Sequence, residues 1–316
     1  MPQLSIIMLA GSLRPSPLRA ELDESVLRMP LRADYCLLDG WLEALSGVEP
    51  SAELRIVVTD LRDIDTLNGM LARPSRRQGA GRKIGVIREP NAWRGTAGLV
   101  RDLAEGLPPE ALVAVLEAGC LPVAPLREVL SAISADCGGV IVAGRDREPA
   151  GISVFRRAAL DRVSRIGYSD MKEQFIPALH QQEFKIALVE RDDPVLRIRD
   201  RRSYLQVIAN CHDVTENASV NGERKVDASA RLIGPCVIER GGSVDAGAIV
   251  HESVVMSGAR IEAGAVVSRS VIGRGVVVEA GERVIERILS PVAVGARAPQ
   301  LPAWQGESSQ GNLATE

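Results

Sequence analysis

The stretch SVDAGAIVHESVVMSGARIEAGAVVSRSVIGRGVVVEAG, residues 243–281, places an aliphatic residue at about every sixth position and repeats as a whole every 17 residues. The triplets DAG, EAG and EAG at 245–247, 262–264 and 279–281 mark the longer repeat. Three hexads with one residue removed make one turn of a triangular coil, in which aliphatic side chains point inward and small residues occupy the corners. Coils of this kind stack, because one coil alone cannot bury its apolar face. The sequence therefore predicts a short left-handed parallel β-helix of about three turns over residues 222–288.

The chain before this repeat has a different pattern. Short runs rich in Val, Ile and Leu alternate with segments in which apolar residues follow a helical spacing. The expected strands are 5–11, 53–60, 83–89, 111–119, 138–144, 151–155 and 184–190, and the expected helices are 41–47, 64–72, 96–107, 125–134, 170–182 and 201–210. Continuous aliphatic strands between helices predict an α/β fold with a doubly wound, mostly parallel sheet. We expect this domain at residues 1–215, and a flexible tail containing Trp304 at residues 289–316.

Composition and charge narrow the classes of partner. The 316 residues carry a formal net charge of −3, so the sequence predicts no nucleic-acid partner and no anionic membrane partner. The five cysteines are widely spaced, without a CxxC pair or a Cys/His cluster, which argues against a zinc site or a disulfide framework. No apolar run approaches the length of a membrane helix. We therefore expect a cytoplasmic protein.

Five segments in the α/β part occur in an order that resembles one enzyme family. They are LAGSLRPSPLR (9–19), RGTAGLV (94–100), AGISVF (150–155), DMKEQFIPAL (170–179) and SYLQVIAN (203–210). Followed by a hexapeptide β-helix, they resemble the sugar-1-phosphate nucleotidyltransferases, over residues 4–285 or thereabouts. The resemblance implies a reaction in which a nucleoside triphosphate and a sugar 1-phosphate give a nucleotide-sugar and pyrophosphate. It also implies Mg²⁺ as the cofactor if the chain is active.

The resemblance assigns roles to individual residues. Phosphate and base contacts fall on Gly11, Arg14, Gly95, Thr96 and Ala97. Sugar contacts fall on Gly151, Lys172 and Glu173. Each assignment has a plainer alternative: Arg14 as a surface arginine, Thr96 as a helix cap, and Lys172 with Glu173 as an exposed helical pair.

The sequence departs from the family pattern at the positions that bind phosphate and metal. The loop that ends at Arg14 has one glycine, where the family has three, so it has the character of a remnant. Glu24 lies near the position of a phosphate-binding lysine, where its negative charge would repel a triphosphate. Cys120 and Arg197 lie where two metal-binding aspartates are expected, with Asp200 as a nearby substitute for the second, so we assign no metal ligand. We interpret Cys120 itself as a buried, inert thiol.

Losing several groups that act as a unit abolishes chemistry. We therefore expect an impaired nucleotidyltransferase-like protein, a pseudoenzyme of nucleotide-sugar or polysaccharide metabolism. It would bind a nucleotide or nucleotide-sugar and act as a scaffold subunit in a homo- or hetero-oligomer. Two alternatives stay open: an active nucleotidyltransferase with an altered loop, and an acyltransferase that uses His251 as a general base. For His251 we favour a solvent-facing position at a corner of the coil.

Overall fold

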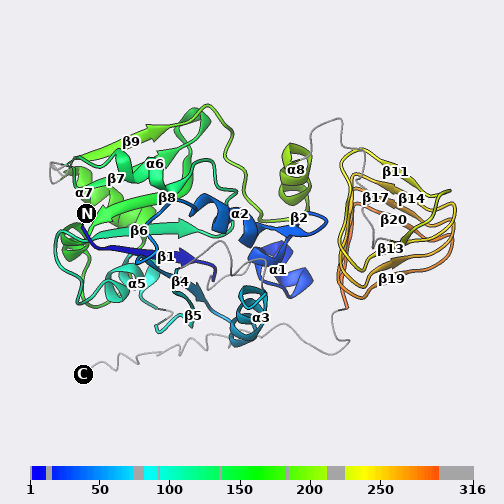
Figure 1. Cartoon of the computed structure of the whole chain (residues 1–316), viewed down its shortest axis with the longest axis horizontal. Helices are drawn as coiled ribbons and strands as arrows, with labels where there is room; N and C mark the ends of the chain where they lie inside the picture. The colour runs from blue at the N-terminus through cyan, green and yellow to red at the C-terminus, as the bar shows by residue number, and fades with distance from the viewer. Residues whose placement is uncertain are drawn as a thin grey trace, which may run out of the picture.

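The computed structural model describes residues 2–11, 16–73, 82–91, 93–134, 137–181, 185–211 and 225–291. It shows an α/β domain with a β-helix attached at one end (Figure 1). Arg14, Trp304 and the domain boundary expected at residue 215 lie outside the described residues. No described helix has the length and apolar character needed to cross a membrane.

A seven-stranded sheet forms the centre of the α/β domain. Its strands in spatial order are β5 (Ile84–Arg88), β4 (Glu53–Val58), β1 (Leu4–Leu9), β6 (Leu112–Glu117), β8 (Pro149–Arg156), β7 (Gly139–Ala143) and β9 (Ile186–Glu190). Only β8 runs antiparallel to its neighbours in this sheet. The expected mostly parallel sheet is thus confirmed, and β8 begins two residues earlier than predicted, at Pro149.

Helices cover both faces of the sheet. They are α1 (Pro17–Leu22), α2 (Leu37–Ala44), α3 (Leu61–Leu71), α5 (Gly95–Leu103), α6 (Leu126–Ser131), α7 (Ile176–Gln181) and α8 (Arg201–Cys211). Alternate side chains of β1 divide between two cores: Ile6 and Met8 pack with α2, α3, α6 and α8, and Ile7 packs with α5 and α7. This is the doubly wound arrangement, in which a strand buried on both faces is apolar throughout.

Shorter elements connect these helices and strands. They are the 3₁₀ turns η1 (Val26–Arg28), η2 (Arg145–Arg147) and η3 (Arg157–Arg162), the π-helical turn η4 (Met171–Phe175), and the hairpin of β2 (Pro30–Arg32) with β3 (Tyr35–Cys36). The helix expected at 170–182 is therefore a π turn followed by α7. The helix expected at 41–47 begins at Leu37, because the Asp39 carboxylate accepts the Cys36 backbone N–H at 2.8 Å and caps it there.

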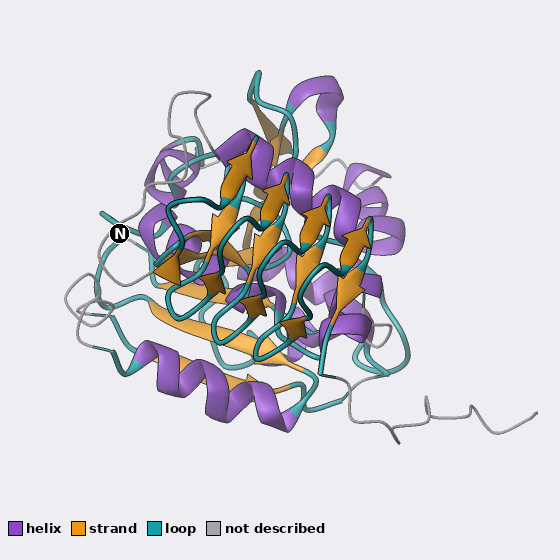
Figure 2. Ribbon diagram, turned by 90° about the vertical axis from the view of Figure 1, so that its right-hand side faces the viewer, coloured by secondary structure: helices purple, strands orange, loops and turns teal. Residues whose placement is uncertain are grey.

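The C-terminal part is a parallel β-helix of four stacked coils (Figure 2). Its strands are β10 (Lys225–Val226), β11 (Arg231–Ile233), β12 (Val237–Ile238), β13 (Ser243–Val244), β14 (Ile249–His251), β15 (Val254–Val255), β16 (Arg260–Ile261), β17 (Val266–Ser268), β18 (Val271–Ile272), β19 (Val277–Val278), β20 (Arg283–Ile285) and β21 (Ile288–Leu289). They form three four-stranded sheets. The predicted repeat is confirmed, but the prediction of about three turns was one coil short.

The corner after the second strand of each coil explains both the 17-residue repeat and the underestimated number of coils. In the first coil three residues, beginning with Gly234, join β11 to β12. In the second coil only Glu252 and Ser253 join β14 to β15. Glu252 turns this tighter corner with a left-handed φ of 45°. The first coil is therefore one residue longer, which hides it from a search for the 17-residue period.

A ladder of buried serines supports the tight corners. Ser253 and Ser270 are fully buried. The Ser270 N–H donates to Ser253 Oγ at 3.0 Å, and the Arg287 N–H donates to Ser270 Oγ at 3.1 Å. Each hydroxyl also donates to a carbonyl in its own coil, that of His251 in the case of Ser253. The ladder thus satisfies backbone groups that face no strand at the corner.

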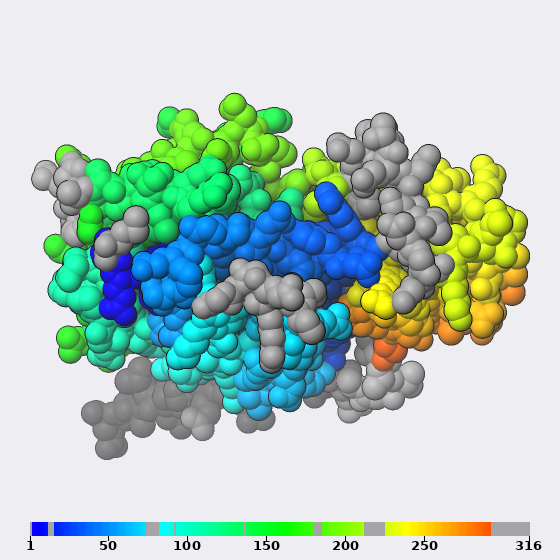
Figure 3. All heavy atoms as spheres, in the orientation of Figure 1, coloured from blue at the N-terminus to red at the C-terminus, as the bar shows by residue number. Residues whose placement is uncertain are grey.

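One apolar cluster contains residues of both parts. Val237, Val254, Met256 and Val271 of the β-helix belong to the same cluster as the core of the α2–α3 face. Figure 3 shows the β-helix, in yellow and orange, in contact with the blue N-terminal segments. The Ser290 hydroxyl donates to the Glu21 carbonyl at 2.5 Å, and so fastens the last coil to α1.

Candidate functional site

Cys120 and Arg197, the residues at the two expected metal-ligand positions, face each other across the carboxyl end of β6. They form an isolated antiparallel bridge, and the Arg197 guanidinium donates to Cys120 Sγ at 2.8 Å. The sequence pointed to these two residues only through the family resemblance, which places each of them where a metal-binding aspartate is expected. Their meeting in space is what two ligands of one metal would require, although neither residue is a carboxylate here.

Cys120 and Arg197 both lie beside the carboxylate of Glu117, the last residue of β6. The Lys172 ammonium lies 2.8 Å from one carboxylate oxygen of Glu117, and the Arg197 guanidinium lies 2.6 Å from the other. Arg197 also contacts Glu148 at 3.3 Å and donates to the Pro149 carbonyl. We call Glu117, Cys120, Lys172 and Arg197 the Glu117 cluster. Sequence reasoning missed Glu117, although its place at the end of a buried strand was a usable signal.

The electrostatics of the cluster fix its charges near neutral pH. Burial raises the pKa of Glu117, but the hydrogen bond and charge of Lys172, together with Arg197, outweigh it, so the pKa lies below its ordinary value. Burial, followed by the Glu117 charge, raises the pKa of Cys120 to about 12. The cluster therefore holds a carboxylate, two cations and a neutral thiol.

These residues do not fit a Mg²⁺ ion. Mg²⁺ needs oxygen ligands, whereas the expected ligand positions hold a protonated thiol and a guanidinium. The one carboxylate between them, that of Glu117, already pairs with two cations. Within the described ranges, no group of three or more His, Cys, Asp or Glu side chains is arranged to bind a metal.

Asp200, the substitute ligand considered from the sequence, has another role. Its carboxylate accepts the Ser203 N–H at 2.7 Å at the start of α8, and the Ser203 hydroxyl lies 2.9 Å away. Hydrogen bonding from Ser203 lowers the pKa of Asp200. Asp200 is thus the N-cap of α8, bound locally rather than within the cluster.

Gly151 lies directly against Cys120. Its φ is +78°, and a Cβ added there would lie 2.6 Å from Cys120 Sγ. Lys172 and Gly151, both predicted to contact the sugar, thus belong to the surroundings of one carboxylate. Glu173 differs: its backbone N–H donates to Asp170 at 3.0 Å, and its side chain is exposed.

The predicted base-contact segment packs against the chain that follows η3. Gly95 and Ala97 are buried, and the N–H of Ala97 donates to the Ser169 carbonyl at 3.0 Å. The Thr96 hydroxyl accepts the Met171 N–H at 2.9 Å, so it joins two segments and does not cap its own helix. The base contact expected of Gly95, Thr96 and Ala97 stays a prediction.

Two residues near the candidate phosphate loop also have structural roles. A Cβ on Gly11 would lie 2.6 Å from the Thr59 backbone nitrogen, so close packing requires glycine there. Glu24, which we expected to repel a triphosphate, pairs instead with Arg274 of the β-helix at 2.8 Å. Its charge is neutralised at the boundary between the two parts.

His251, the residue of the acyltransferase alternative, lies half-buried on β14. Its Nδ1 is 2.9 Å from the Ser268 hydroxyl in the next coil, and its Nε2 is 3.8 Å from Glu252. The histidine lies at the end of its strand, as expected for a corner residue. Its closest polar partner is the residue stacked on it in the ladder of strands.

Residues 211–287 match the family described as GlmU-like, C-terminal hexapeptide. The match covers about a quarter of the chain and agrees with the four observed coils. The C-terminal part is therefore a hexapeptide-repeat left-handed β-helix. No curated protein matches the chain.

Proposed function

We propose that this chain is a nucleotidyltransferase-like protein of nucleotide-sugar metabolism that has lost metal-dependent transfer and acts as a binding or scaffold subunit. The observation that supports it is the pairing of Cys120 with Arg197 at the two positions where the resemblance expects metal carboxylates. The GlmU-like hexapeptide match at residues 211–287 supports the assignment to the same group of proteins.

The chemistry of the cluster explains the proposed loss. Attack of a sugar phosphate on the α-phosphorus builds negative charge, which a bridging Mg²⁺ neutralises in this family. Here Arg197 is committed to Glu117, Glu148, Cys120 and the Pro149 carbonyl. Lys172 is the more exposed cation, but it too is paired with Glu117. Ion pairs within the protein thus occupy the position at which the family would bind Mg²⁺ and phosphate.

The first experiment measures pyrophosphate release from ATP, GTP, UTP and dTTP with common sugar 1-phosphates, with and without Mg²⁺. We expect no release above the enzyme-free rate. Mg²⁺-dependent release with any pair would overturn the proposal. Thermal shift against the same nucleotides and their nucleotide-sugars then tests binding, because a ligand of the native state raises the midpoint.

A reconstruction variant makes the test sharper. Cys120→Asp with Arg197→Asp restores two carboxylates beside Glu117, and calorimetry with MgCl₂ should detect a site in this variant and none in the wild type. Cys120→Ser is the matched control, because it changes the same position without adding charge. Mg²⁺ binding of equal strength to the wild type and the reconstruction would contradict our interpretation of the cluster.

The acyltransferase is the second candidate, favoured only by the hexapeptide match and by His251. It predicts consumption of acetyl-coenzyme A that disappears in His251→Ala. We expect no consumption, because His251 bonds to Ser268 within the ladder of strands.

A further inference from the structure

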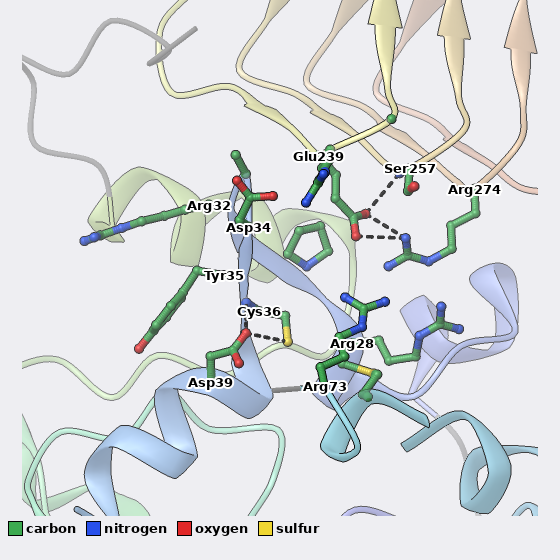
Figure 4. A pocket seen from close by; sticks show the side chains of 15 residues that line it. Arg28, Arg32, Asp34, Tyr35, Cys36, Asp39, Arg73, Glu239, Ser257 and Arg274 are labelled. Carbon is green, nitrogen blue, oxygen red and sulfur yellow. Dashed lines mark hydrogen bonds and ion pairs between the residues drawn. The ribbon is translucent and has the colours of Figure 1, made fainter. Parts of the chain in front are cut away.

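A cleft of about 850 Å³ lies between the α/β domain and the β-helix, away from the Glu117 cluster. One wall comes from η1, the β2–β3 hairpin and the end of α3, and the other comes from the corners of the β-helix coils (Figure 4). We call it the junction cleft. Its volume lies within the range of about 300–1,000 Å³ that is typical of small-molecule sites.

The cleft carries more positive than negative charge. Its described lining contains five arginines and three carboxylates, a formal excess of two. The arginines are Arg28, Arg32, Arg73, Arg240 and Arg274. Glu24, which pairs with Arg274 and Arg28, reduces the excess to one. A cleft of this size with a positive balance favours an anionic ligand over a neutral one.

The positive charge is concentrated at one end. Figure 4 shows Arg28, Arg73 and Arg274 gathered at this end, while Arg32 and Tyr35 lie at the other. Arg274 is tied to Glu24 and Glu239 at 2.8 Å each, which fixes its position. Arg28 has a looser contact with Glu24 at 3.5 Å.

Arg73 is an arginine of the cleft whose charge is not neutralised by any described residue. It is exposed at the end of α3, and no ion pair joins it to another described residue. A guanidinium offers planar donors that match a phosphate in a two-point contact. Arg73 with Arg28 can therefore hold a phosphate group against the fixed Arg274 and leave the rest of the cleft for the body of the ligand.

We propose that the junction cleft binds a small phosphorylated anion, with its phosphate between Arg28 and Arg73, and that this ligand joins the α/β domain to the β-helix. This site is independent of the function proposed for the Glu117 cluster. The ligand contacts residues of both parts, so binding stabilises their association.

The cleft is also connected to the candidate phosphate loop. Glu24 follows α1, the short helix that begins where that loop ends. Within α1, the Leu18 N–H donates to the Arg199 carbonyl at 3.1 Å, two residues from Arg197 of the Glu117 cluster. Arg274 of the cleft is therefore linked through Glu24 to the segment that follows α1.

The test is calorimetry and thermal shift with inorganic phosphate and glucose 6-phosphate, with glucose as the uncharged control. We expect saturable binding of both phosphates, weakened by added NaCl, and none of glucose. Arg73→Gln should lower the affinity about tenfold or more, as the loss of one charged hydrogen-bonding partner implies. Arg231→Gln, an exposed arginine on β11 outside the cleft, should leave the affinity unchanged.

The outcomes separate this proposal from the one above. Because Arg73 is exposed, its substitution leaves the fold intact. Arg28→Gln, at the half-buried arginine on the other side of the proposed phosphate, serves as a second variant. Lys172→Met should bind phosphate as the wild type does. No phosphate binding, or equal affinity in wild type and Arg73→Gln, overturns the proposal. Loss of phosphate binding in Lys172→Met but not in Arg73→Gln would place the anion at the Glu117 cluster, and that too overturns it.

Discussion

Gly151→Ala tests whether the candidate site is built as described, because this glycine forms the floor under Cys120. The residue has a φ of +78°, which costs a non-glycine residue about 1–2 kcal/mol. The new Cβ would also lie 2.6 Å from Cys120 Sγ and 2.8 Å from its Cβ. Overpacking of a tight site costs about 1–3 kcal/mol. Together these terms predict a loss of about 3 kcal/mol in the free energy of unfolding.

Differential scanning fluorimetry measures this change directly. For a domain of this size, about 3 kcal/mol corresponds to a fall in Tm on the order of 6–12 °C. Gly69→Ala is the matched control: Gly69 is exposed within α3 with nothing within 4 Å of an added Cβ, so alanine should stabilise by about 1 kcal/mol. Adding Cys120→Ala to Gly151→Ala removes the closer clash and should recover part of the loss. If Gly151→Ala melts no lower than Gly69→Ala, the contact between Gly151 and Cys120 is wrong.

Three further predictions concern the cluster and the serine ladder. Lys172→Met should lower stability most at neutral pH: the pKa of Glu117 lies below its ordinary 4.5, so the stabilising pair is present above that value and is lost as the pH falls through the folded-state pKa. Urea midpoints of variant and wild type should therefore converge as the pH falls through the lowered folded-state pKa of Glu117, and a difference that stays constant from neutral to acidic pH would contradict the assignment. Cys120, with a pKa of about 12, should resist iodoacetamide at pH 8 in the native protein and react only after unfolding, as peptide mass mapping would show. Ser270→Ala removes the acceptor of the Arg287 N–H and should cost about 1–3 kcal/mol in the free energy of unfolding, measured by urea titration; a neutral result would mean that the buried ladder contributes nothing.

The β-helix was predictable because its information is local and periodic. Val250, Val267 and Val284 recur every 17 residues and stack in the structure, as the repeat requires. The number of turns was underestimated because the corner at Gly234 in the first coil has one residue more, which breaks the 17-residue period without breaking the stack. The apolar strands of the α/β domain were predictable for the same local reason, since each is a short aliphatic run.

The charge partners could not be predicted in this way. Glu24 and Arg274 are 250 residues apart and carry no local sign of pairing. Sequence reasoning therefore interpreted Glu24 by its position in a motif, as a charge that opposes phosphate. The Glu117 cluster shows the same limit, because Cys120 and Arg197 were found through the resemblance while the carboxylate between them was not. Pairing of ions across a fold depends on topology, which residue types alone do not reveal.

The core that runs from the α2–α3 face into the β-helix has a consequence for how the chain is made. Val254, Met256 and Val271 belong to one buried cluster with apolar side chains of the N-terminal residues, including Leu27 and Met29. During synthesis the N-terminal members of this cluster leave the ribosome before the coils that complete it. A truncation after α8 should therefore give an aggregating product rather than a free domain. The β-helix therefore completes the fold, and we expect that without it the α/β part does not fold stably either.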